Sequence, residues 1–516
     1  MAKKAAVKPR PAARVKPKTK PSPPSVAGVA ATVRMYAQGL GDCFLLTFPG
    51  ATGSKPARVL IDCGVFQGTP GESDRLRQVA LEIKEETGGE IDLLIVTHEH
   101  WDHVAGFSRA FDLFEGITFG AVWLSWAEDG DDPAARALKA DLGRSRDRVR
   151  AALTHFKTPG VTLGARAEQD MRTAESLLNF FGPNPEAGLA GGGGPRVGMS
   201  LGETMDWLRS KVRPGDFRKP GQRRNLPGAP GVKVYVLGPP SDPQAIRKMD
   251  PTGDQGYGLR SERVSLAAAI GAMVAGDTSP AGPFDGRHRV NPEDARLDPF
   301  FREVYGFADD PMGDAGSAWR RIDDEWLGGL SRLALQLDTG VNNTSLALAF
   351  ELPDGRTLIF PGDAQIGNWL SWDDVTFRDE EERALAVTAK GLLNRAVFYK
   401  VGHHGSHNAT RKAGGLEEMT GGGLVAMVPT DEAFAKTKRP PESGWKMPFD
   451  ALNRALDTAT GHRILRPDRT EAELDQAAGD DAGTARWKQF RGRVRFATET
   501  LVGTDRKLYV EYDVPG

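Results

Sequence analysis

Three histidines and one aspartate occur within six consecutive positions, and this cluster constrains the fold more than any other feature of the sequence. It lies in the stretch IVTHEHWDHVAG at 95–106 and consists of His98, His100, Asp102 and His103. The apolar residues directly before it, LLIV at 93–96, predict a buried strand, so the cluster follows a strand end. Imidazole and carboxylate groups gathered at one point are ligands that zinc accepts. The spacing therefore predicts a metal site.

An isolated histidine in a strand is usually a hydrogen-bonded core residue or a solvated surface residue. For any single member of this cluster, that explanation would be preferred. Burying four such groups without a metal, however, costs their desolvation four times over. The chain has only nine histidines in 516 residues, so three of them within six positions favour the metal site.

Three other strand-like segments also end in potential ligands. The segment ARVLIDCG (57–64) reaches Asp62, whose carboxylate is expected to orient a metal-bound histidine, although a turn-capping aspartate is the alternative. The segment GRTLIFPGDAQ (355–365) reaches Asp363. The segment RAVFYKVGHHGSHNAT (395–410) ends in a polar group, namely His403, His404, Ser406 and His407. Ligands gathered from separate strand ends indicate an open catalytic metal site more than a compact structural one.

Strand-like and helix-like segments alternate along the chain, which favours an α/β or α+β fold. The stretch 33–48 predicts two strands around a Gly-rich turn, and 73–86 predicts a helix before the strand that precedes the histidines. Two regions interrupt this pattern, at about 125–230 and about 250–335. The first contains a stretch at 131–180 that is rich in Ala, Arg, Glu and Leu, and is therefore expected to be helical.

We expect a disordered basic tail at 1–30, a catalytic domain at 31–415 that contains both inserts, and a C-terminal extension at 416–516. The tail carries eight Lys or Arg residues, several Pro and no acidic residue. A solvating extension is the favoured interpretation of the tail, and a weak contact with nucleic acid or another polyanion is the alternative. The C-terminal extension contains strand-like RVRFATETLVG and KLYVEYDV, which suit an addition to a sheet or a lid.

The chain has only two cysteines, Cys43 and Cys63, in apolar strand-like segments, and both are expected to be small buried hydrophobic residues. No run approaches the roughly 18 consecutive apolar residues of a membrane span. The basic tail also lacks the apolar region of a secretory signal. The sequence thus predicts a reduced, soluble, cytoplasmic protein with no membrane partner, and it leaves the oligomeric state open.

The motif HEHWDH matches the His-x-His-x-Asp-His motif of the metallo-β-lactamase superfamily, and Asp62, Asp363 and the late histidines follow that superfamily's order. More narrowly, QGLGDCFLL, LIDCG, VLGPP, NNTSL, FPGDA and KVGHHGS resemble the hydrolase domain of ComEC-type DNA-uptake proteins. These six short islands cover 33 to about 410, but neither insert nor the residues after 416. The resemblance implies an α/β fold of the αββα sandwich type, with a zinc pair at one edge.

The resemblance also implies ligands for two Zn²⁺ ions, and another divalent ion such as Mn²⁺ is the alternative. The implied ligands are His98 and His100 for one ion, Asp102, His103 and His404 for the other, and Asp363 as the bridge between them. We favour His404 over His403 as the ligand, so that His403 faces the substrate and donates a proton or a hydrogen bond. The expected catalytic residues are Asp102, Asp363 and His403.

Three residues are expected to support the ligands from outside, namely Asp62, Ser406 and His407. For Ser406 and His407, a role as turn residues that cap a following helix is an equal alternative. The resemblance also has a gap, because superfamily members supply a further histidine to the first metal from a strand in the middle of the chain. Gly238, in VLGPP, stands at the matching place, and His155 and His288 lie in the inserts. The first site is therefore expected to be weaker, or the chain to hold one metal tightly.

Zinc lowers the pKa of bound water from about 15.7 to about 7, so hydroxide is available at neutral pH. The leading hypothesis is a zinc-dependent metallohydrolase that uses this metal-bound hydroxide on a phosphodiester, in a small molecule or in nucleic acid. One alternative is the hydrolysis of a lactone, thioester or other small ester, because such a site attacks carbonyl and phosphoryl centres alike. The other alternative is a catalytically idle interaction protein that retains the metal. ComEC proteins have a multi-span channel that this chain lacks, so DNA uptake does not follow from the resemblance.

Overall fold

The structure is a computed structural model of the 516-residue chain. It describes residues 28–50, 54–157, 165–183, 198–249, 251, 255–257, 297–305, 322–438, 445–501 and 504–516. The basic tail expected at 1–30 lies outside these residues up to position 27, and the first strand begins at Val29. His288 also lies outside the described residues.

The first sheet has eight strands within the described residues, in the order β14-β15-β1-β2-β3-β4-β5-β6. Their bounds are β1 (Val29–Tyr36), β2 (Phe44–Phe48), β3 (Ala57–Ile61), β4 (Glu90–Ile95), β5 (Thr118–Ser125), β6 (Phe217–Arg218), β14 (Val494–Leu501) and β15 (Thr504–Pro515). The pairs β1–β2 and β2–β3 are antiparallel, whereas β3–β4 and β4–β5 are parallel. The helix α1 (Glu72–Thr87) forms the crossover between β3 and β4, as a parallel pair requires.

The second sheet has seven strands within the described residues, in the order β13-β12-β11-β10-β9-β8-β7. Their bounds are β7 (Arg223–Leu226), β8 (Ala229–Gly238), β9 (Ala347–Glu351), β10 (Thr357–Phe360), β11 (Ala396–Lys400), β12 (Val425–Met427) and β13 (Ile464–Leu465). Strands β10 to β13 run parallel to one another. Residues after 416 thus add β12 and β13 to this sheet, and β14 and β15 to the other.

The two sheets pack face to face through the apolar side of each strand. In β2, Phe44, Leu46 and Phe48 belong to this inner core, whereas Leu45 faces the outer helices, which is the period of two expected for a strand. Aromatic pairs join the sheets, because the ring of Phe44 lies 5.8 Å from that of Phe360. The alternation of apolar side chains therefore places β2 between a sheet and a helical layer.

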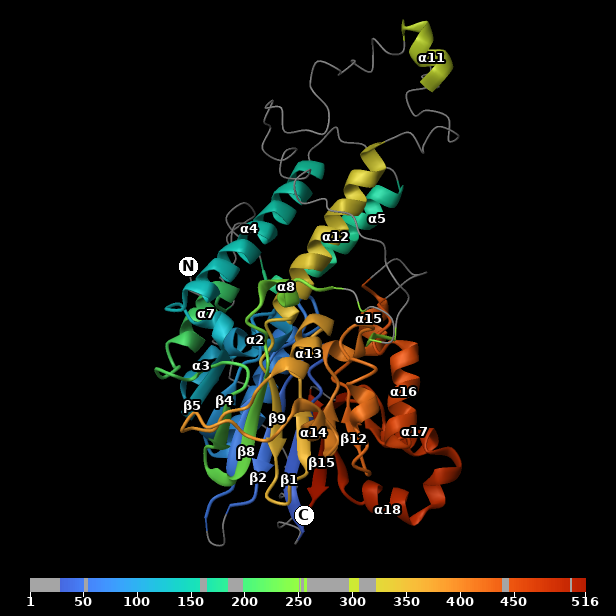
Figure 1. Cartoon of the computed structure of the whole chain (residues 1–516). Helices are drawn as coiled ribbons and strands as arrows, with labels where there is room; N and C mark the ends of the chain where they lie inside the picture. The colour runs from blue at the N-terminus through green and yellow to red at the C-terminus, as the bar shows by residue number, and fades with distance from the viewer. Residues whose placement is uncertain are drawn as a thin grey trace, which may run out of the picture.

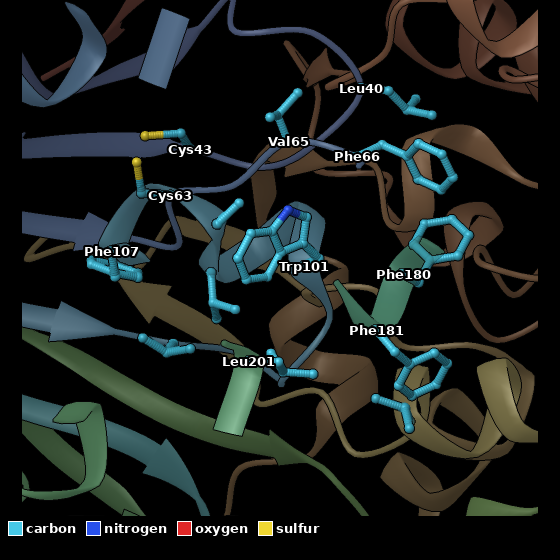
Figure 2. Packing of buried hydrophobic residues seen from close by; sticks show 14 of the residues in the cluster. Leu40, Cys43, Cys63, Val65, Phe66, Trp101, Phe107, Phe180, Phe181 and Leu201 are labelled. Carbon is cyan, nitrogen blue, oxygen red and sulfur yellow. The ribbon is translucent and has the colours of Figure 1, made fainter. Parts of the chain in front are cut away.

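Helices cover the outer face of each sheet, so the fold is an α/β sandwich with αββα layers (Figure 1). On the first sheet lie α1, α2 (Trp101–Arg109) and α7 (Leu201–Arg209), packed through a core around Trp101 that Figure 2 shows in part. This core includes Cys43 and Cys63, which are both buried and free, as expected. On the second sheet lie α13 (Ile366–Ser371), α14 (Ala389–Leu393) and α16 (Asp450–Thr460).

Three long helices from the two predicted inserts stand above the sandwich. These are α4 (Pro133–Phe156), α5 (Ala165–Leu178) and α12 (Ile322–Asn342), and α12 packs against the other two (Figure 1). The shorter helices are α3 (Phe111–Glu115), α8 (Pro243–Ile246), α11 (Pro299–Tyr305), α15 (Glu432–Lys436), α17 (Glu471–Ala477) and α18 (Ala485–Arg491). Short 3₁₀ turns are η1 (Trp126–Glu128), η2 (Asn179–Phe181), η6 (Trp372–Asp374), η7 (His403–Gly405), η8 (Leu416–Glu418) and η9 (Gly479–Gly483). Within the described residues, no helix has the length and apolar character to cross a membrane.

Candidate metal centre

The ligands expected from the sequence follow the carboxyl ends of four strands. Asp62 follows β3, the cluster that begins at His98 follows β4, Asp363 follows β10, and His403 and His404 follow β11. Because β3 and β4 are parallel, as are β10 and β11, each pair ends at one edge of its sheet. The stacking of the two sheets brings these edges together, and the predicted residues from distant segments meet there.

Four of these side chains converge on one point. Asp102, His103, Asp363 and His404 offer ligand atoms that all lie within 4.8 Å of one another. His404 Nε2 lies 2.9 Å from Asp102 Oδ2, and His103 Nε2 lies 3.1 Å from Asp363 Oδ2. Every member is at most 1% exposed. Two imidazoles and two carboxylates in this arrangement could hold a divalent metal ion.

The two histidines of this cluster are fixed from behind by hydrogen bonds. His103 Nδ1 donates to Asp62 Oδ2 over 2.8 Å, and His404 Nδ1 donates to the carbonyl oxygen of Pro429 over 2.7 Å. Asp62 is itself held by Thr97, whose backbone N–H and hydroxyl both donate to its carboxylate. With Nδ1 bonded in this way, each ring directs Nε2 toward the cluster. Burial alone would lower the pKa of both rings, but the carboxylates of the cluster raise the pKa of each above its usual value. Asp62 thus contacts His103 from outside the cluster.

Lys400 contacts the outer oxygen of Asp363 and was not anticipated from the sequence. Its Nζ donates to Asp363 Oδ1 over 2.9 Å and to the Gly362 carbonyl over 2.7 Å, and the backbone N–H of His403 donates to the same Oδ1 over 2.9 Å. Burial alone would raise the pKa of Asp363, but Lys400 and His103 hold it well below its usual value. Asp363 is therefore ionised, and its Oδ2 is directed at the cluster.

A second group of possible ligands consists of Asp42, Asp62 and His103. Here His103 would have to use Nδ1, which already donates to Asp62. Asp42 also forms an ion pair with the buried Lys400. We therefore assign this group to the support of the first cluster and not to a separate ion.

His98 and His100 form a neighbouring pair. His98 Nε2 lies 3.1 Å from His100 Nδ1, while His98 Nδ1 lies 3.2 Å from the hydroxyl of Ser345. Burial lowers the pKa of His98 well below its usual value and that of His100 to about 3, so both rings are neutral. Among the described residues, neither belongs to a group of three His, Cys, Asp or Glu ligands. The pair lies beside the four-residue cluster, since the rings of His98 and His103 are 4.2 Å apart.

His403 lies next to the cluster, but its ring does not join it. Its Nδ1 lies 3.1 Å from Gln365 Nε2 and 3.0 Å from the Ser406 hydroxyl. Gln365 accepts from Asn408 through its oxygen, so its amide nitrogen donates to His403 Nδ1 and leaves the proton on Nε2. Burial lowers the pKa of His403 to about 4, so the ring is neutral. The Ser406 hydroxyl contacts His403, whereas His407 is exposed and lies against Phe449, outside the cluster.

The backbone at these positions is unusual. Asp62, His403 and His404 have positive φ angles of 56°, 43° and 54°, a region that residues other than glycine rarely adopt. Such strain persists only where the surroundings enforce it, and it occurs mainly at functional sites. Gly64 permits the close approach of the Asp62 loop, because a Cβ atom there would lie 2.2 Å from the carbonyl carbon of Asp102.

An aromatic cover, formed by Phe180, Phe181 and Trp445, lies over the histidines. The ring of Phe181 lies 5.0 Å from His100, and that of Phe180 lies 5.3 Å from His100 and 6.1 Å from His403. Trp445 stacks on Phe180 at 5.6 Å, and Figure 2 shows Phe66 beside Phe180. The sequence analysis missed this cover, because Phe180 and Phe181 end the helical stretch of an insert that matched no motif.

The family comparison agrees with this geometry. The model of the metallo-beta-lactamase superfamily matches residues 40–114, which include β2 to β4, Asp62 and the whole HEHWDH motif. This match supports the superfamily. No curated protein and no solved structure matches the chain, so the narrower resemblance to ComEC-type hydrolase domains has no support from a relative. The superfamily match and the buried His/Asp cluster together suggest a metal-dependent hydrolase.

Proposed function

We propose that the chain is a metallohydrolase that cleaves a phosphodiester bond in a small molecule. Its principal metal would be held by the four-residue cluster of Asp102, His103, Asp363 and His404. The observation that carries this proposal is the convergence of two imidazole nitrogens and two carboxylates, of which His103, His404 and Asp363 are each held by a partner outside the cluster. Zn²⁺ is the favoured ion, because it accepts this mixture of nitrogen and oxygen ligands.

The unsatisfied atoms of the cluster fit a cation. Within the described part of the chain, Asp102 Oδ1, His103 Nε2 and Asp363 Oδ2 have no well-aligned hydrogen-bond partner, although their side chains are at most 1% exposed. A buried polar group left in this state costs about 1–3 kcal/mol, and more when it is charged. A divalent ion held by the cluster would give His103 Nε2 and Asp363 Oδ2, which lie 3.1 Å apart, a common partner and would offset the buried negative charge of the two carboxylates.

The roles of the chain's own groups follow from their contacts. A divalent ion bound there supplies Lewis acidity and lowers the pKa of a bound water to about 7. Asp363, kept ionised by Lys400, turns Oδ2 inward and can accept a hydrogen bond from the attacking water. His403 is neutral and carries its proton on Nε2, an atom without a hydrogen-bond partner among the described residues. His403 therefore donates a hydrogen bond to the oxyanion that develops on the substrate.

The substrate class is argued from the neighbouring histidines and the aromatic cover. The His98–His100 pair offers a position for a second ion beside the first, and two ions can stabilise both the attacking and the leaving oxygen of a phosphodiester. The ligands are almost fully buried beneath Phe180 and Phe181, which favours a small substrate over a polynucleotide. The apolar face of the same cover also favours the second candidate, hydrolysis of a small ester, lactone or thioester with an apolar group.

Elemental analysis and a substrate panel test this proposal. Protein purified without chelator should contain a divalent metal and should hydrolyse bis(p-nitrophenyl) phosphate faster than p-nitrophenyl acetate, a lactone or a thioester. The Asp363→Asn variant, measured beside it, should lose this turnover. Cleavage of the carbonyl substrates alone would transfer the assignment to the ester hydrolase. Metal without turnover on the whole panel would indicate a metal-retaining interaction protein.

A further inference from the structure

We infer that Asn342 supplies the third ligand of the first metal position through its amide oxygen, and that Asp338 positions both Asn342 and His100 for this task. The inference rests on the metal occupancy proposed above. The first position has two histidine nitrogens, His98 Nε2 and His100 Nδ1, 3.1 Å apart. Catalytic zinc sites commonly have three protein ligands, so one is missing from this pair.

The strand position that would supply a mid-chain histidine cannot carry a side chain. Gly238 ends β8, and a Cβ atom there would lie 2.0 Å from Asn368 Oδ1. The same Asn368 donates through Nδ2 to the carbonyl oxygens of Asn343 and Ser345, over 3.1 and 2.9 Å. The space beside Gly238 is thus used to hold the turn at 343–345, which directly follows Asn342.

Asn342 is the last residue of α12, and its amide oxygen faces the histidine pair. Asn342 Oδ1 lies 3.0 Å from His100 Nδ1, the nitrogen that also faces His98, and the residue is fully buried. Its Nδ2 donates to Asp338 Oδ2 over 3.1 Å, one helical turn earlier. In this orientation the amide nitrogen faces Asp338 and the amide oxygen faces the histidines.

Asp338 reaches the other nitrogen of His100. Its Oδ1 lies 3.9 Å from His100 Nε2, and neither atom has a hydrogen-bond partner within the described residues. Asp338 is only 3% exposed. If His100 binds a metal through Nδ1, its proton lies on Nε2 and points toward this carboxylate, which is the usual outer partner of a metal-bound imidazole. Two adjacent unsatisfied atoms that become a pair on metal binding distinguish this arrangement from an ordinary buried asparagine.

Metal titration of the full chain tests the inference. Metal-free protein should bind two equivalents of Co²⁺, each with its own visible absorption band. The Asn342→Leu variant, of similar size, should lose at least about 100-fold in affinity for one equivalent, and the other should be unchanged. The Asp338→Asn variant should weaken the same equivalent by about 10- to 100-fold, the usual effect of losing an outer partner. His404→Ala serves as the matched control, because it should weaken the opposite equivalent.

A double variant guards against loss of folding. Asn342→Asp combined with Asp338→Asn exchanges donor and acceptor across the same contact and keeps an oxygen toward His100, so it should bind both equivalents. If Asn342→Leu kept both equivalents with unchanged affinity and spectrum, the inference would be overturned while the proposed hydrolase survived. A folded double variant that lost the first equivalent would overturn it equally. If the wild-type protein bound only one equivalent of Co²⁺, with an affinity that His98→Ala did not change, the inference would be refuted and a one-metal hydrolase would remain. If the wild-type protein bound no metal at all, both proposals would be refuted.

Discussion

At the residue scale, the site depends on which nitrogen of each histidine the protein occupies. His98, His103 and His404 each have Nδ1 engaged by a fixed neighbour and turn Nε2 inward. His100 is reversed, since its Nδ1 faces the neighbouring histidine and its Nε2 faces Asp338. Because the outer partner sets the tautomer, a substitution outside the ligand set can disable a ligand that is itself intact.

The adjacent histidines of η7 should fail in different ways when they are replaced. His404→Ala removes a nitrogen from the four-residue cluster, so metal content and rate should both fall. His403→Ala should keep its metal and lose about 10²–10⁴ in rate, the effect usual for one donor to a developing oxyanion. Elemental analysis together with phosphodiester turnover separates the two cases.

His407→Ala provides the matched control, because His407 is exposed and belongs to the same short segment. It should keep both metal and rate. Loss of metal from the position-403 variant alone would reverse the assignment of the two histidines. Unchanged metal and rate in the variants at both 403 and 404 would remove this segment from the site altogether.

The candidate ligands could be singled out in the sequence because each follows an apolar run that marks a strand end, and such ends meet at one edge of a sheet. Lys400 and Asn342 could not be predicted in the same way. A lysine after an apolar strand is usually solvated, and an asparagine at a helix end is usually a cap. Their roles depend on partners that only the tertiary fold brings near, Asp363 for Lys400 and His100 for Asn342.

At the scale of elements, helices of the two inserts contact the candidate metal site. The helix α12 packs against α4 and α5 and ends at Asn342, inside the site. The helix α4 is bound to the metal motif itself, because Lys139 forms ion pairs with Glu99 and with Glu128 of η1. The composition predicted helices in the first insert. It did not predict that they pack against α12, since their contacts join segments far apart in the chain.

The ion pairs around Glu128 should make the attachment of α4 dependent on pH. Glu128 is 3% exposed and accepts from Lys139 and Arg209. Burial alone would raise its pKa, but the two cations bring it below its ordinary value of 4.5. A carboxyl with a lowered folded pKa stabilises the fold above its unfolded pKa and loses this contribution as the pH falls through the folded one.

Glu128→Gln should therefore reduce the free energy of unfolding at pH 7 by about 3 kcal/mol. This is near the lower end of the roughly 3–5 kcal/mol that breaking a buried ion pair costs, because Lys139 would keep its ion pair with Glu99. The difference between variant and wild type should shrink as the pH falls below about 4.5, where the wild-type carboxyl begins to lose its advantage. Urea unfolding at a series of pH values measures this difference. A difference that stayed constant from pH 7 to about pH 3.5 would contradict the assigned role of the charge.

At the scale of the whole molecule, the last described strand, β15, lies beside the first strand, β1, in the same sheet. β15 pairs antiparallel with β1 from Val29 to Tyr36, and a buried ion pair between Arg34 and Glu511 reinforces the contact, with Nε 2.8 Å from the carboxylate. The sequence indicated that the C-terminal residues form strands. It did not indicate their partner, because periodicity reports the faces of a strand and not its neighbour. Only the fold therefore shows that β15 pairs with β1.

The pairing of β1 with β15 determines where the basic tail can be removed without disturbing the sheet. All eight Lys and Arg residues of the tail precede position 21, and Val29 pairs with Pro515, so a truncation should stop at residue 27. Removing 1–27 should leave kcat/KM for a small phosphodiester unchanged, because the removed segment includes no residue of the site. Affinity for a single-stranded oligonucleotide should fall if the tail contacts polyanions, and the loss should diminish between about 50 and about 200 mM salt as counterion release weakens.

A full-length variant with the eight basic residues changed to Gln isolates charge from chain length and should behave like the truncation. Equal losses on both substrates would show instead that the segment supports the fold, and oligonucleotide binding that did not change with truncation would assign the tail to solvation alone.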